Sequence, residues 1–91
     1  MTVSVRIPTT LRPLSGGQSE VVLDGATVRE VFDKLEAAHP GFAARLLDDD
    51  GNLRKFVNVF VADDDIRFLS GLETPVPEGE TVSIIPAVAG G

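Results

Sequence analysis

Apolar residues gather in five short segments of the chain that we predict to be strands, and in the first of them they alternate with polar residues, a pattern typical of a half-buried strand. The predicted strands are residues 2–7, 20–23, 56–61, 66–69 and 81–87. The clearest is the segment 56–61, which has a β-branched face of Val57, Val59 and Val61 and an opposite face of Phe56, Asn58 and Phe60. Two prolines and the pair Gly16-Gly17 separate the first two strands. We therefore expect these strands to form a hairpin joined by a long loop.

A longer period marks residues 27–38, where apolar residues recur every three or four positions, as on one face of a helix. This stripe consists of Val28, Val31, Phe32, Leu35 and Ala38. Thr27 and Glu30 have the spacing of a capping box, in which each side chain satisfies a free backbone N–H. Pro40 ends the helix because proline disfavours helical geometry in the residue before it. A further helical turn is expected over residues 42–46, which begin with Phe42 and end with Leu46.

The helix and the sheet each need the other to bury an apolar face, so the order ββαβ(β)β predicts an α+β fold. We expect a four- to five-stranded mixed sheet wrapped over one main helix, an arrangement that resembles the ubiquitin-like β-grasp domains. That resemblance implies that the first and last strands lie in the sheet interior. The expected core consists of Val3, Val5, Ile7, Val28, Phe32, Leu35, Val57, Val59, Val61, Val82 and Ile84. We assign residues 1–87 to this domain and residues 88–91 to a flexible C-terminal diglycine tail.

Composition narrows the classes of function. The 91 residues suffice for one small domain, and 43% hydrophobic with 24% charged residues is ordinary for a globular protein. The chain has no cysteine, which excludes a disulfide, a cysteine metal site and a cysteine nucleophile. The net charge of −6 arises in residues 46–91, which carry three basic and nine acidic side chains, against five of each in residues 1–45. This balance disfavours nucleic acid as a partner and suits a protein partner with a basic groove.

The sequence also favours a cytoplasmic protein that does not bind membranes. No apolar run approaches the roughly 20 residues that span a bilayer. The first residues, MTVSVRIP, lack the charged and apolar regions of a signal peptide.

One acidic segment has part of the pattern of a calcium loop. Asp48, Asp50 and Asn52 occupy its first three side-chain positions. However, Leu53 stands where the loop needs glycine, and Val59 stands where it needs a bidentate glutamate. We therefore predict a polar turn and no metal site.

The sequence predicts no catalytic residue. His39 is the single histidine, and it is interpreted as a residue at the end of the helix, where the helix dipole favours it. Gly16-Gly17 lacks the lysine and the spacing of a phosphate-binding P-loop. Residues 63–65 are three aspartates that indicate another polar turn. The chain is therefore not expected to be an enzyme on its own, nor to bind a cofactor itself.

The last six residues, PAVAGG, indicate a different kind of chemistry. Two glycines lack a Cβ atom and can enter a narrow channel where backbone must approach closely. A terminal carboxylate is a poor electrophile, but as an acyl-adenylate it becomes a good one, and Gly91 leaves its carbonyl open to an attacking sulfur. We therefore predict that Val88, Ala89, Gly90 and Gly91 form an extended tail that threads into partner active sites.

Three stretches of the chain together resemble the MoaD/ThiS family of ubiquitin-like sulfur carriers. They are PAVAGG at the end, FVNVFVADDDIRFLSGLETPVPEGETVSIIPAVAGG across the C-terminal half, and IPTTLRPLSGGQ after the first strand. The last of these is most similar to the actinobacterial branch of the family that serves cysteine biosynthesis. The resemblance covers essentially the whole chain.

This resemblance implies a mechanism in which the chain is a protein co-substrate. An E1-like enzyme adenylates the Gly91 carboxylate with ATP, and a sulfur donor converts it to a thiocarboxylate. A pyridoxal-phosphate-dependent cysteine synthase that uses O-phosphoserine accepts the sulfur, and a zinc metalloprotease then releases cysteine. ATP, pyridoxal phosphate and zinc are thus expected on the partner enzymes.

Two alternatives stay open at this point. One is the small sulfur-carrier subunit of molybdopterin synthase. The other is a ubiquitin-like protein modifier, whose terminal glycine forms an isopeptide bond to a lysine.

Phe56 and Phe60 are the candidate docking residues. If Val57, Val59 and Val61 face the core, these two aromatic side chains face away from it. Cross-strand packing is one explanation of such aromatics. The other is a contact surface for the activating enzyme or the synthase, with the aromatics as anchors.

Overall fold

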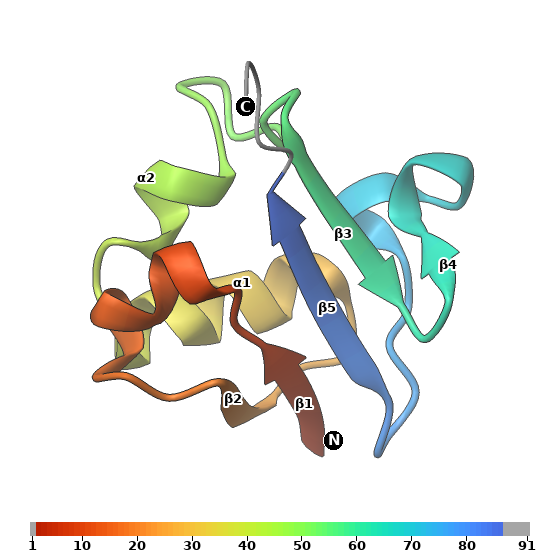
Figure 1. Ribbon diagram of the computed structural model, residues 1–91. Coiled ribbons are helices and arrows are strands. Elements are labelled where there is room, and N and C mark those ends of the chain that lie inside the picture. The colour runs from red at the N-terminus through yellow and green to blue at the C-terminus, as the bar shows by residue number, and fades with distance from the viewer. Residues whose placement is uncertain (1, 87–91) are drawn as a thin grey trace.

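The first and last strands of the chain lie side by side at the centre of one five-stranded sheet (Figure 1). The computed structural model describes residues 2–86. Strand β1 (Thr2–Arg6) is parallel to β5 (Thr81–Pro86), with Val5 opposite Val82. The order across the sheet is β2-β1-β5-β3-β4. The expected interior position of the terminal strands, and with it the ubiquitin-like β-grasp fold, is confirmed.

The remaining strands join this central pair in antiparallel fashion. Strand β2 (Glu20–Asp24) forms the predicted hairpin with β1. Strand β3 (Val57–Val61) pairs with the other side of β5, so that Val57 lies opposite Pro86. Strand β4 (Asp64–Asp65) completes the far edge.

Helix α1 (Val28–Ala38) packs across one face of the sheet, and Thr27 caps its first turn. The Thr27 hydroxyl accepts a hydrogen bond from the Glu30 N–H at 3.3 Å. The Glu30 carboxylate accepts from the Ala26 N–H at 3.0 Å, one residue earlier than in the predicted capping box. Gly25 precedes this cap, and a Cβ atom there would lie 2.7 Å from Cγ2 of Val31. The entry into α1 is therefore too tight for any side chain at this position.

The short helix α2 (Phe42–Leu46) lies where a helical turn was expected, and a single carboxylate connects it to α1. Glu36 accepts hydrogen bonds from the N–H groups of Gly41 and Ala43, the latter at 2.8 Å. His39 occupies the C-cap of α1, as predicted, and its ring meets that of Phe42 edge-on.

The core lies between α1 and the sheet. All eleven residues predicted for it are buried, and Leu35, Val5 and Val59 are fully enclosed. Val21 of β2 and Val31 of α1 are buried in the same layer. Loops and short helices close its ends with a further set of buried side chains, Leu11, Phe42, Leu46, Ile66, Leu72 and Val76. Among residues 2–86, no helix is long and apolar enough to cross a membrane.

The predicted strand over residues 66–69 is wrong. Residues Ile66–Phe68 form a 3₁₀ helix, and the strand lies earlier, at Asp64–Asp65, where a turn was expected. The cause is a two-residue connection after β3, in which Ala62 adopts a left-handed backbone with φ of 57°. It returns the chain at once, and Asp65 then caps the 3₁₀ helix by accepting the Arg67 N–H at 2.8 Å.

Two connections are also more ordered than a turn. The loop after β1 contains a 3₁₀ helix, Thr9–Ser15, and the turn near residue 71 contains another, Gly71–Glu73.

Candidate functional site

The described chain stops at the base of the predicted tail. Val88, Ala89, Gly90 and Gly91, together with Ala87 at the end of the predicted strand, lie outside residues 2–86. The last described residue, Pro86, ends β5 beside Val57, the first residue of β3. The pair of Val57 and Pro86, where β3 begins and β5 ends, therefore marks the point from which the chain continues into the predicted tail.

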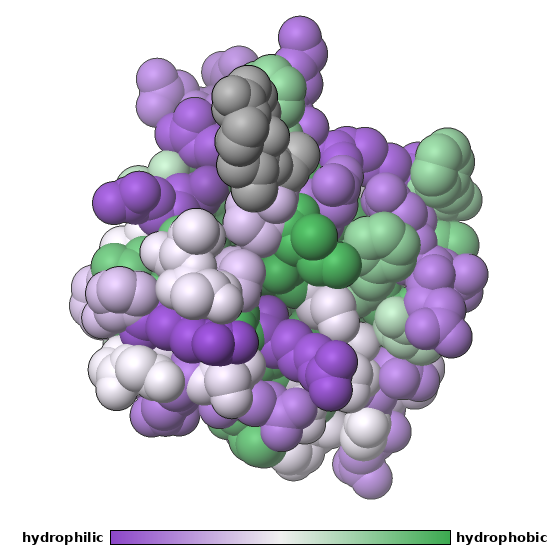
Figure 2. Space-filling model, viewed as in Figure 1, coloured by the Kyte–Doolittle hydropathy of each residue, from purple (hydrophilic) through white to green (hydrophobic). Residues whose placement is uncertain are grey.

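We call the side of the sheet opposite α1 the outer face. Val59 and Ile84 point inward, so their neighbours in sequence, Phe60 and Ile85, lie on the outer face. Phe60 is half-buried and lies opposite Ser83, which makes Ile85 its diagonal neighbour. Figure 2 shows hydrophobic side chains gathered over β3 and β5, with polar side chains around them.

Ile85 is a candidate contact residue that the sequence analysis missed. Its side chain is 49% exposed, and it lies one residue before the end of β5. The signal was present in the sequence, because Val82 and Ile84 on the inner face imply that Ile85 lies on the other.

Phe56 differs from its predicted position. It lies in the turn before β3 rather than in the strand, so it does not share a strand face with Phe60. Its side chain is 59% exposed and lines a hollow together with Leu53 and Val57. Phe56 is thus an apolar group beside the base of the tail, and Phe60 is a partly covered one on the outer face.

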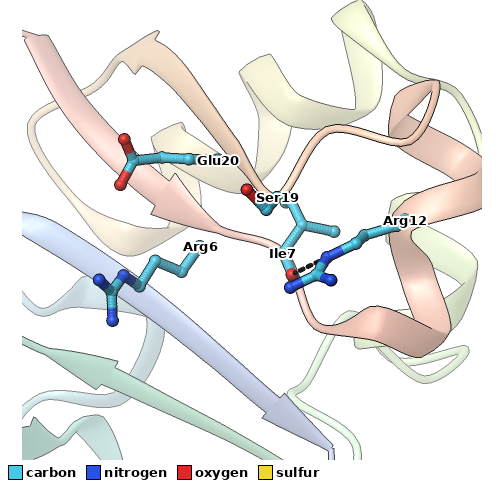
Figure 3. Close-up of a pocket in the computed structure, with 5 residues that line it drawn as sticks. All are labelled: Arg6, Ile7, Arg12, Ser19 and Glu20. Atoms are coloured by element: carbon cyan, nitrogen blue, oxygen red, sulfur yellow. Dashed lines mark hydrogen bonds between the residues drawn. The ribbon is translucent and has the colours of Figure 1, made fainter.

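A second hollow lies on the other side of β5 and is polar. It is lined by Arg6, Ile7, Arg12, Ser19 and Glu20 (Figure 3). The Arg12 Nε atom donates to the Ile7 carbonyl at 3.2 Å. Arg6 lies opposite Ser83 of β5, so its cationic side chain borders the apolar side chains of the outer face. This hollow offers charge to a binding partner.

The acidic segment of residues 48–52 forms a turn, as predicted. The Asp48 carboxylate accepts the N–H groups of Asp50 at 2.9 Å and of Asn52 at 3.0 Å, so it is occupied by its own loop. Within residues 2–86, no group of three histidine or acidic side chains is arranged to hold a metal ion.

Comparison with known proteins identifies the family of this chain. Residues 5–91 match the ThiS family. The chain belongs to the ThiS family. A curated relative, "Sulfur carrier protein CysO" from Mycobacterium tuberculosis, is 48% identical over 93 residues, which cover all of both chains. The family resemblance inferred from PAVAGG and the two longer stretches is thus confirmed.

Two further proteins are similar to this chain over nearly its whole length. A chain in the crystal structure of the Amycolatopsis orientalis BexX/CysO complex superposes with a TM-score of 0.92 at 49% identity, covering 98% of this chain and 99% of that one. "Small archaeal modifier protein 3" from Haloferax volcanii is 38% identical over 93 residues, again covering all of both chains. The matched CysO protein is named as a carrier, and this confirms the prediction that the chain is a carrier rather than an enzyme.

Proposed function

We propose that this chain is a sulfur carrier whose Gly91 carboxylate is activated and converted to a thiocarboxylate, which then donates sulfur for cysteine synthesis from O-phosphoserine. The observation that supports this most is the 48% identity with CysO over the whole of both chains. The family match also runs through Gly91, the residue that would carry the sulfur.

The chemistry uses one atom group of this chain. The Gly91 carboxylate attacks the α-phosphate of ATP, and pyrophosphate leaves. Sulfide from a donor then attacks the acyl carbon. A C–S bond forms, the bond between the acyl carbon and the phosphate oxygen breaks, and AMP leaves with that oxygen. An E1-like partner enzyme supplies the site for both steps. The chain itself contributes a slim tail, because Gly90 and Gly91 carry no side chain that would obstruct a narrow channel.

The outer face gives this partner a surface to bind. Phe60 and Ile85 supply apolar contact area next to the strand that leads into the tail, and Arg6 supplies charge beside them. The Amycolatopsis structure is named as a complex of CysO with BexX, which supports assembly with a protein partner. The partners we propose are an E1-like sulfurtransferase that binds ATP, a pyridoxal-phosphate-dependent cysteine synthase and a zinc metalloprotease.

A second candidate function is protein modification. It is favoured by the 38% identity with the Haloferax volcanii modifier protein over the whole of both chains. In that case the activated Gly91 acyl group would pass to a lysine amine and form an isopeptide bond, and no sulfur would reach a small molecule.

One reaction separates these two functions. The chain, activated with ATP and sulfide, is incubated with O-phosphoserine and the cysteine synthase, and its intact mass is measured. A sulfur carrier for cysteine becomes heavier than its native carboxylate form by one cysteine residue, joined to Gly91, because the sulfur of the thiocarboxylate is retained in that residue. A carrier that keeps its thiocarboxylate unchanged here, yet forms lysine conjugates with other proteins, is a modifier.

A further inference from the structure

Arg67 connects three parts of the chain near the base of the tail. Its Nη1 atom donates to the Asn58 side-chain oxygen at 2.8 Å, which ties it to β3. Its Nη2 atom donates to the carbonyl of Arg54 at 2.7 Å and to that of Lys55 at 3.1 Å. One guanidinium therefore holds the backbone of the turn before β3 against the strand itself.

In the described structure, the Arg67 guanidinium forms these hydrogen bonds rather than an ion pair with a carboxylate. Within residues 2–86, the ion pair that forms joins Arg29 to Glu73 and does not include Arg67. Asp65 lies only two residues before Arg67, but its carboxylate accepts the Arg67 backbone N–H rather than the guanidinium. The side-chain N–H groups of Arg67 thus donate to the Asn58 side-chain oxygen and to two backbone carbonyls, and the latter bonds fix the backbone of residues 54 and 55.

The turn formed by residues 54–56 has one backbone bond of its own, from the Val57 N–H to the Arg54 carbonyl at 3.1 Å, and is otherwise held by contacts from outside it. Its first residue is fixed to α2, where the Arg54 N–H donates to the Leu46 carbonyl at 2.9 Å. Its last residue, Phe56, is 59% exposed, so burial of that ring does little to hold it. Between them, the Arg54 and Lys55 carbonyls are the groups that Arg67 holds.

Phe56 lies next to the point where the described chain ends and the predicted tail begins. It directly precedes Val57, the residue opposite Pro86, beyond which the chain continues into the predicted tail. An exposed phenylalanine held there is an anchor for a partner that must also take in the tail.

We propose that Arg67 is a positioning residue: it holds the turn of residues 54–56 so that Phe56 is presented, beside the start of the tail, to an apolar pocket of the activating enzyme. This inference rests on the proposed function. Arg67 acts through Phe56 and not by touching the partner. Because Arg67 is itself exposed and its bonds compete with water, the expected effect is a change in affinity rather than loss of the fold.

The test is the steady-state rate of thiocarboxylation by the E1-like enzyme with ATP and sulfide, measured against the concentration of the full chain. We expect Arg67→Ala to raise KM about three- to tenfold and to leave kcat unchanged, because binding is impaired and the chemistry at Gly91 is not. The lysine of Arg67→Lys can reach one carbonyl but cannot form the forked contact, so its KM should lie between those of the native chain and Arg67→Ala. Arg29→Ala is the matched control, since it removes an exposed arginine that bonds Glu73, and its KM should stay native.

A double-mutant cycle separates positioning from direct contact. Phe56→Ala should also raise KM, and the variant with both changes should be no worse than Phe56→Ala alone. Additive losses would mean that Arg67 touches the partner itself and would overturn the positioning role. A native KM for Arg67→Ala would overturn it too, while the sulfur-carrier function would stand. If the native chain is not thiocarboxylated at all, the proposed function fails, and this inference fails with it.

Discussion

The two faces of the sheet differ in how much of their apolar side-chain area is buried within the fold. The inner face is built from β-branched and aliphatic residues such as Val5, Val59 and Val82, all fully buried against α1. The outer face is polar over most of its area, yet it keeps Ile85 about half exposed beside a half-buried Phe60. Apolar area that a fold leaves in water is available to a partner. The inner face therefore determines stability, and the outer face is the surface that we propose a partner binds.

The largest effect on stability should come from truncating the inner face. Leu35→Ala removes a fully buried side chain of α1 and should cost about 2–5 kcal/mol of unfolding free energy. Val22→Ala is the control, because Val22 is 60% exposed and its truncation should change stability by less than about 0.5 kcal/mol. Chemical denaturation of both variants checks this. Equal losses would mean that the two faces do not differ as described.

A smaller loss is expected where the chain enters α1. A Cβ atom on Gly25 would meet Val31, so Gly25→Ala should cost about 1–3 kcal/mol as the helix shifts to relieve the overlap. Gly51→Ala offers no contact within 4 Å but has a φ of 82°, so it reports backbone strain without overlap. Its thermal unfolding, compared with that of Gly25→Ala, separates the two causes. An unchanged melting temperature for Gly25→Ala would contradict the packing of this corner.

Truncation on the outer face should affect binding more than folding. Phe60→Ala should weaken binding to the activating enzyme about tenfold, because an aromatic anchor next to Ile85 is lost. Phe68→Ala is a matched control, since that ring is 87% exposed and belongs to the 3₁₀ helix of residues 66–68 rather than to the outer face. Affinities are measured by titration calorimetry. If Phe60→Ala binds both partner enzymes with native affinity, the outer face is not the docking surface.

The smallest effect is a gain. Ala62 has a left-handed backbone, which glycine adopts more easily, so Ala62→Gly should stabilise the chain by about 0.5–1 kcal/mol. A rise of a few degrees in the melting temperature, with unchanged thiocarboxylation, is the expected result. A lower melting temperature would show that the connection after β3 is not strained.

Much of the fold could be predicted because its signals are local. Alternation at Val57, Val59 and Val61 indicates a strand, and Thr27 before an apolar stripe indicates the start of a helix. The segment 66–69 was predicted wrongly for the same reason. Its apolar residues suggest a strand, but the backbone of Ala62 and the capping by Asp65 decide the path of the chain.

The candidate site was less accessible from the sequence. Ile85 could have been found from the period of β5, and Phe56 was identified although its strand position was wrong. The bonds of Arg67 could not be found, because they reach backbone carbonyls 12 and 13 residues away. Every residue has a carbonyl, so such a contact leaves no signature in the types of the residues that it joins.

The most direct test of the account is the intact mass of the chain after incubation with the activating enzyme, ATP and sulfide. The native chain should gain the mass difference between sulfur and oxygen. A chain with one residue added after Gly91 should gain nothing, nor should one that lacks Gly91, because either change displaces the reacting carboxylate. If the extended chain is thiocarboxylated without prior trimming by a protease, Gly91 is not the group that carries sulfur.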